Sequence, residues 1–119
     1  MRIKRILSFG HAFDGIRIAW REEAHVKIHV VAAVLVLAAS WTFHISKTEF
    51  IVVLVMIAIV MTAELLNTAL EELCDKFQPS HDPHIGKIKD LAAAAVFIAS
   101  GAAFTIGCII FIPYLLMYL

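Results

Sequence analysis

The segment AELLNTALEELCD occupies residues 63–75 and follows an apolar run that begins at Phe50. That run is too short to cross a membrane, because about 20 residues at about 1.5 Å each are needed to cover a hydrocarbon core about 30 Å thick. The span is therefore expected to continue through Glu64 and Asn67 and to end near residues 69–73. The sequence thus predicts a carboxylate at membrane depth.

The polar side chains of this segment share one face of the expected helix. At about 100° per residue, Glu64, Asn67, Glu71 and Asp75 fall on a stripe less than about 90° wide. Carboxylates are costly inside a bilayer, so such a stripe turns towards protein or water and indicates a functional site. For Asp75, as for Glu72, a plainer interpretation is a solvated charge at the end of the helix.

The composition is that of an integral membrane protein. Of the 119 residues, 61% are hydrophobic and 17% are charged, and the apolar residues come in long blocks. This pattern predicts one all-α membrane domain over residues 1–119, with three transmembrane helices and an N-terminal amphipathic surface helix. The predicted bounds are 2–22 for the surface helix, 26–45, 49–75 and 90–112 for the spans, and 76–89 for a cytoplasmic loop.

The surface helix is predicted from apolar residues spaced three and four apart, with charges on its other faces. These apolar residues are Ile6, Phe9, Phe13, Ile16 and Trp20. The helix either anchors on anionic lipid or forms one wall of the site, and periodicity favours the anchor. Trp20 marks the membrane interface and is a weak candidate for contact with a lipid substrate.

The distribution of basic residues predicts the orientation. They precede the first span and recur between the second and third, whereas the connection between the first two spans holds only Lys47. By the positive-inside rule, the N-terminus and the 76–89 loop are cytoplasmic, and the C-terminus lies on the far side. The formal net charge is zero, and no nucleic-acid partner is expected.

Local signals indicate where the spans begin and end. Ser46 and Thr48 are both able to cap the second span. Prolines at 79 and 83 with a glycine at 86 argue against a continuous helix through the 76–89 segment, so Asp90 is expected to cap the third span. That span is expected to end before Pro113. Its small residues over 92–103, which are alanines together with Ser100 and Gly101, favour close helix packing or oligomers.

Neither cysteine indicates a disulfide or a metal site. Cys74 and Cys108 lack the CxxC spacing and are interpreted as packing residues. His25 and His29 are four residues apart, but the helical glutamate that accompanies such a pair in zinc motifs is missing. A metal site at these histidines is therefore not favoured.

The predicted topology brings polar residues from different spans to one cytoplasmic plane. These residues are Glu23, Glu71, Lys89 and Asp90. Carboxylates hold Mg²⁺ together with phosphate oxygens, and a lysine neutralises phosphate charge, so this set suits phosphoryl transfer from a nucleotide. Glu64 lies one to two turns deeper and is placed to accept a hydroxyl proton.

A function of another class is also compatible with acids inside the membrane. Glu64 and Glu71 would then form a proton or cation pathway in a non-enzymatic membrane subunit. This alternative leaves Lys89 and Asp90 unexplained. It also lacks an acid in the third span, or deep in the first, that would continue a path across the membrane.

The motif AELLNTALE at 63–71, followed by KDLAAAAV at 89–96, closely resembles the small bacterial integral-membrane diacylglycerol kinase family, which includes undecaprenol kinases. The resemblance covers almost the whole chain, including Trp20, Glu23 and the pair Ile28-His29. It implies a homotrimer in the bacterial cytoplasmic membrane that uses MgATP to phosphorylate a lipid hydroxyl. The form of the core motif and the Ile28-His29 pair favour undecaprenol over diacylglycerol as that lipid.

The resemblance also implies a role for each matched residue. Glu64 would be the catalytic base and would contact the lipid substrate, and Glu23 and Glu71 would bind the metal. The expected nucleotide or active-site contacts are Asn67, Asp75, Lys89 and Asp90. The segment 82–90 departs from the common family pattern, so the resemblance does not indicate which residues contact adenine.

Overall fold

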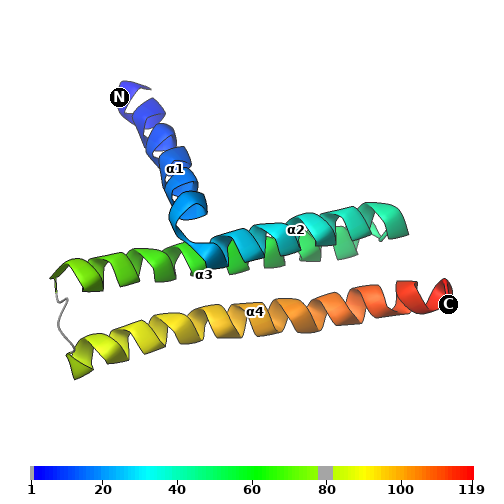
Figure 1. The fold of residues 1–119 in the computed structure, drawn as a ribbon. Helices are drawn as coiled ribbons and strands as arrows, with labels where there is room; N and C mark the ends of the chain where they lie inside the picture. Colours follow the sequence, from blue (N-terminus) through cyan, green and yellow to red (C-terminus); the bar gives the residue numbers. More distant parts are fainter. Residues whose placement is uncertain (1, 78–81) are drawn as a thin grey trace.

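Residues 2–77 and 82–119 form four α-helices (Figure 1). The computed structural model describes residues 2–77 and 82–119, with side chains from residue 8 onward in the first helix. The helices are α1 (Arg2–Glu22), α2 (Ala24–Phe43), α3 (Lys47–Phe77) and α4 (Pro83–Met117). The described residues contain no strand, and the predicted all-α class is confirmed.

Three of these helices are long and apolar enough to cross a membrane. With 20, 31 and 35 residues, α2, α3 and α4 extend over about 30, 46 and 52 Å, so the last two exceed a hydrocarbon core about 30 Å thick. Figure 1 shows these three helices running alongside one another, with α1 directed away from them. Among the pairs of helices, α3 and α4 pack most extensively, and α2 packs on α3.

The break between α1 and α2 falls at Glu23. This residue is extended, with φ −115° and ψ 114°, and its side chain makes no capping hydrogen bond to α2. The first span therefore begins at Ala24, two residues before the predicted start. The chain turns away from α1 here, and the Glu23 carboxylate is left free of any role in closing the helix end.

The connection between α2 and α3 is held by hydrogen bonds at both ends. His44 adopts a left-handed conformation, with φ 51°, and its amide donates to the carbonyls of Ser40 and Trp41. The Glu49 amide donates to Ser46 Oγ at 3.1 Å, and the Ser46 amide donates to Glu49 Oε1 at 3.0 Å. This reciprocal arrangement is a capping box. Ser46, not Thr48, is therefore the cap, and α3 begins at residue 47 instead of 49.

The predicted start of the third span at Asp90 is wrong. Asp82 is the actual cap of α4, because its Oδ1 accepts hydrogen bonds from the amides of His84 at 2.7 Å and Ile85 at 3.4 Å. Pro83 occupies the first helical position, where its missing N–H costs nothing and its fixed φ favours the helix. Most of the segment predicted as a loop is thus helical, and its residues 78–81, with Pro79, lie outside the described residues.

The predicted end of this span before Pro113 is also wrong, because α4 continues through that residue to Met117. Proline is tolerated within membrane helices. Losing one backbone hydrogen bond there is less costly than ending the helix and leaving several carbonyl groups unpaired in an apolar environment.

Aromatic contacts join the ends of α2, α3 and α4 on the side opposite α1. The ring of Phe43 lies 6.1 Å from that of Tyr114 and 5.6 Å from that of Tyr118, between centroids. The Tyr114 hydroxyl donates to Glu49 Oε1. The start of α3 is therefore fastened to the last turns of α4.

Few side chains are buried within the protomer. The buried apolar residues are small or medium in size: Ala19, Val26, Val53, Val60, Cys74, Ala92, Ala99 and Ile110. Large apolar side chains such as Trp41, Ile98 and Phe97 are exposed. This outward apolar surface is that of a membrane-embedded bundle. Cys74 is buried, Cys108 is partly buried, and both are free thiols.

Candidate functional site

Glu64 is the one charged residue that the described part of the chain buries, with 3% of its surface exposed. It lies on α3 and faces α2, where His29 places Nε2 at 3.4 Å from Glu64 Oε2. Among the described residues, no other side chain pairs with this carboxylate. An isolated buried carboxylate is very costly, so the His29 contact is the feature that makes this position tenable.

The sequence did not identify His29 as the neighbour of Glu64. A signal was present in the short α2–α3 connection, which makes the two helices antiparallel neighbours. His29 lies 14 residues before the end of α2 and Glu64 lies 17 residues after the start of α3. These separations correspond to about 21 and 26 Å from the turn, which differ by less than one helical turn.

Asn67 and Glu71 form a second polar pair one turn nearer the end of α3. Asn67 Nδ2 donates to Glu71 Oε1 at 3.5 Å, and both residues are partly buried. Asn67 Oδ1 is buried and has no hydrogen-bond partner among the described residues. The amide of Asn67 therefore turns its nitrogen to the carboxylate and leaves its oxygen unsatisfied.

Asp75 and Lys89 form a third pair, which joins α3 to α4. Lys89 Nζ donates to Asp75 Oδ1, and the two side chains are 36% and 65% exposed. Asp90 follows on an exposed position of α4. The acidic stripe of α3 therefore runs from a buried acid, through a half-buried pair, to a solvated ion pair at the helix end.

The assignment of a metal to Glu23 and Glu71 remains a prediction. The described residues hold no group of three or more His, Cys, Asp or Glu side chains able to share an ion. The carboxylate of Glu71 and the amide oxygen of its neighbour Asn67 are nevertheless hard oxygen donors of the kind that Mg²⁺ prefers, usually with one or two carboxylates. The donor chemistry at Asn67 and Glu71 therefore fits magnesium.

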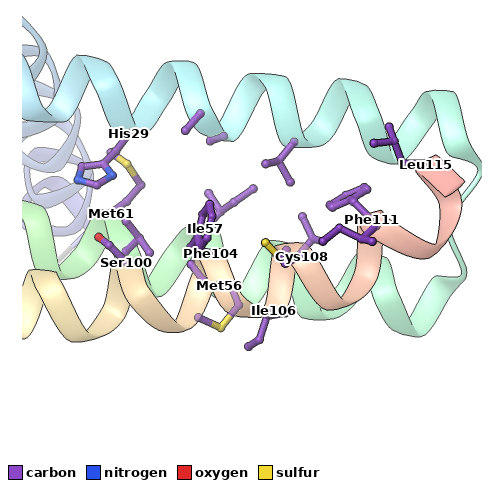
Figure 2. A pocket seen from close by; sticks show the side chains of 18 residues that line it. His29, Met56, Ile57, Met61, Ser100, Phe104, Ile106, Cys108, Phe111 and Leu115 are labelled. Atoms are coloured by element: carbon purple, nitrogen blue, oxygen red, sulfur yellow. The ribbon is translucent and has the colours of Figure 1, made fainter.

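An apolar cavity of about 480 Å³ lies between α2, α3 and α4 (Figure 2). Figure 2 shows His29, Met61 and Ser100 together at one end and Phe111 and Leu115 at the other. Ser100 Oγ is buried there and has no hydrogen-bond partner within the part of the chain that the structure describes. His29 thus lines the cavity while also contacting Glu64, which places the buried acid next to a space suited to hydrocarbon.

A second hollow, also of about 480 Å³, lies on α3 and α4. Asn67 lines it together with small side chains that include Ala63, Ala92 and Ala95. The small residues of α4 lie in two environments, one buried within the protomer and one exposed on its surface. Ala92 and Ala99 are buried, whereas Ala95 and Gly101 are exposed.

These features define the class of the protein as a multi-pass α-helical membrane protein with a buried acid between two spans and a polar stripe leading out from it. Residues 10–111 match the prokaryotic diacylglycerol kinase family, and the chain belongs to that family. It is a lipid kinase, with a lipid substrate and ATP as the phosphoryl donor. Membership of this family favours the kinase over the alternative of a non-enzymatic ion pathway.

The relatives extend over most of the chain. The undecaprenol kinase of Bacillus subtilis is 35% identical over 91% of this chain and 88% of its own length. The diacylglycerol kinase of Synechocystis is 34% identical over 93% of this chain and 64% of its own length. The diacylglycerol kinase of Escherichia coli K12 is 29% identical over 88% of this chain and 86% of its own length. Proteins named for two different lipids are therefore similar to this chain.

Proposed function

We propose that this protein phosphorylates undecaprenol with MgATP at the cytoplasmic face of the bacterial inner membrane. The lipid hydroxyl oxygen attacks the γ-phosphorus of ATP and forms a new O–P bond. The bond from that phosphorus to the β–γ bridging oxygen breaks, and ADP leaves. The hydroxyl proton passes to the Glu64 carboxylate, which acts as the general base.

The observation that carries this proposal is the burial of Glu64 beside an apolar cavity. The carboxylate is 4% exposed and contacts His29, which itself lines the cavity between the three spans. A base for a soluble alcohol has no need of such a position. A hydroxyl at the end of a long hydrocarbon must reach its base at membrane depth, where this acid lies.

The metal is assigned to Glu71 and Glu23. Asn67 orients the Glu71 carboxylate through the 3.5 Å contact from its Nδ2, and its one side-chain oxygen, Oδ1, accepts no hydrogen bond from the described residues. Magnesium supplies charge neutralisation at the phosphates in kinases. Glu23 is free to join it because its side chain is not used to cap α2.

The nucleotide is assigned to the end of the α3 polar stripe at Asp75. Lys89 supplies positive charge for the phosphates, and the ion pair with Asp75 holds its ammonium group over the end of α3. Asp90 completes the set on the next position of α4. These residues lie near the loop that the positive-inside rule assigns to the cytoplasm, where ATP is available.

We further propose that the protein is a homotrimer with its N-terminus in the cytoplasm. The exposed small residues of α4, including Ala95 and Gly101, allow close approach of a helix from another protomer. The exposed apolar residues of α1, among them Phe9 and Phe13, suit a helix lying in the membrane interface.

The substrate assignment rests on the core motif, the Ile28-His29 pair and the similarity to the Bacillus subtilis enzyme. It is tested by measuring transfer of labelled γ-phosphate from ATP to undecaprenol, a short polyprenol and diacylglycerol in mixed micelles. The proposal expects the highest kcat/KM with undecaprenol. A higher kcat/KM with diacylglycerol refutes the substrate assignment and leaves the class of reaction intact.

A further inference from the structure

His29 and Glu64 are the one polar side-chain pair that joins α2 to α3 within residues 8–77. Both are sheltered, since the His29 side chain is 21% exposed and that of Glu64 is 4% exposed. Val26, one turn earlier on α2, is 2% exposed. Residues three apart share a helix face, so α2 presents Val26 and His29 to the bundle together. The imidazole is therefore held at the buried acid by the packing of the helix that carries it.

The geometry suits donation from the imidazole to the carboxylate. The Nε2–Oε2 contact allows an imidazole with a hydrogen on Nε2 to act as the donor and the carboxylate as the acceptor, and the other nitrogen then remains an acceptor. The separation of 3.4 Å exceeds the 2.7–3.2 Å that is usual for N–H···O hydrogen bonds. Such contacts are often long in unliganded active sites and shorten when the reacting complex forms.

We propose that His29 is a positioning residue for phosphoryl transfer, with its Nε2–H holding Oε2 of Glu64 so that Oε1 faces the lipid hydroxyl. This inference rests on the proposed role of Glu64 as the base. In the reaction His29 retains its hydrogen, and Glu64 Oε1 receives the one released by the hydroxyl. The histidine acts on the base and does not touch the phosphate.

The cavity supports this assignment over a purely structural pairing. His29 lies at the end of an apolar space that extends to Leu115, so it forms the boundary between that space and the carboxylate. A lipid chain in the cavity would bring its hydroxyl to the imidazole edge. The orientation of the carboxylate at that boundary then decides whether the hydroxyl meets an acceptor oxygen.

The first test compares two substitutions of His29 with a matched control on the same helix. His29→Leu removes the donor and keeps an apolar side chain, whereas His29→Gln places an amide N–H close to the position of Nε2. A hydrogen bond to a charged group corresponds to a factor of about 10 to 100 in rate. We expect kcat to fall by about that factor in His29→Leu and by less than about fivefold in His29→Gln, with the KM for ATP unchanged.

His25→Leu is the control, because residue 25 is exposed one turn earlier on α2, and its kcat should match that of the unaltered protein. A structural role for His29 makes a different prediction. His29→Leu would then melt at lower temperature or lose its oligomer, while kcat per folded enzyme stayed normal. That result, or equal losses in the leucine and glutamine variants, overturns the proposal.

A double variant tests whether His29 acts through Glu64. If it does, adding His29→Leu to Glu64→Gln should cause no further loss of kcat, because no base remains to be oriented. A further tenfold loss in the double variant would show that His29 acts independently and would contradict the proposal.

The same variants of His29 and Glu64 distinguish a failure of this inference from a failure of the proposed function. If Glu64→Gln retains its turnover, the proposed base is wrong and the inference fails with it. If Glu64→Gln is inactive while His29→Leu has normal kcat, the base stands and the positioning role alone is refuted. All measurements use the full chain with saturating ATP and the preferred lipid of the micelle panel.

Discussion

Replacing Glu64 with glutamine removes the proposed base while changing the structure little. The side chain is 4% exposed and contacts His29 at 3.4 Å, and glutamine has the same shape and can still accept from the imidazole through its amide oxygen. The helix packing should therefore persist. The amide cannot take a proton from the lipid hydroxyl, so the loss should fall on the chemical step.

The expected size of this loss follows from the role of a base. General base catalysis contributes a factor of about 10² to 10⁴, which corresponds to about 2.7 to 5.4 kcal/mol of transition-state stabilisation. Glu64→Gln should therefore lose at least about a hundredfold in kcat and keep similar apparent affinities for ATP and lipid. Turnover, nucleotide affinity and thermal melting are measured on one preparation.

Two further variants provide a control and a test of the position of the acid. Glu72→Gln is the matched control, because it removes an exposed acid from the same helix, and its kcat should be unchanged. Glu64→Asp keeps an acid but withdraws it by one methylene group, so it should recover part of the lost rate. A small misplacement of a reacting group can itself cost about a hundredfold. The kcat of Glu64→Asp should therefore stay below that of the unaltered protein.

Three results would refute the reasoning. Near-normal turnover of Glu64→Gln would exclude a role as base. Weaker MgATP binding, with part of the rate restored by added Mg²⁺, would place Glu64 among the metal ligands. Poor assembly and a lower melting temperature, with normal kcat in the folded fraction, would make the His29 contact a structural one only.

Glu71→Gln and Glu23→Gln should each lose most turnover and require more Mg²⁺ for half-maximal rate, since each removes one proposed ligand carboxylate; an unchanged magnesium dependence in both would refute the metal assignment. Gly101→Leu should shift the oligomer distribution on crosslinking, because a large side chain at this exposed position blocks close helix approach, and an unaltered trimer would contradict the proposed interface. Asp82→Ala should lower the free energy of unfolding by about 1 kcal/mol, because it removes the cap of α4, and an unchanged melting curve would argue against that role.

The sequence by itself determined the number of candidate spans and predicted an acid within one of them. Both depend on local properties, since the thickness of a bilayer sets how many consecutive apolar residues a span requires. The apolar residues from Phe50 onward reach that length only by including Glu64. The stripe of polar residues on α3 followed likewise from the helical period.

The start of the third span is a place where two local sequence signals disagree. Asp82 and Pro83 form a recognisable helix start, but the glycine and prolines around them suggested a loop, and the start was placed at Asp90. At its start α4 is extended because Asp82 caps the helix and Pro83 fits its first position. At its end α4 continues through Pro113 because backbone groups in a membrane need internal hydrogen bonds.

The neighbour of Glu64 was decided only by the tertiary structure. The sequence showed His29 near the start of the first span but did not show that its side chain faces α3. That depends on how α2 is rotated against its neighbour, which is fixed by the burial of Val26 and by contacts between residues 35 positions apart in the chain. Helical periodicity defines which residues share a face, but only the packing of one helix on another determines which face meets which.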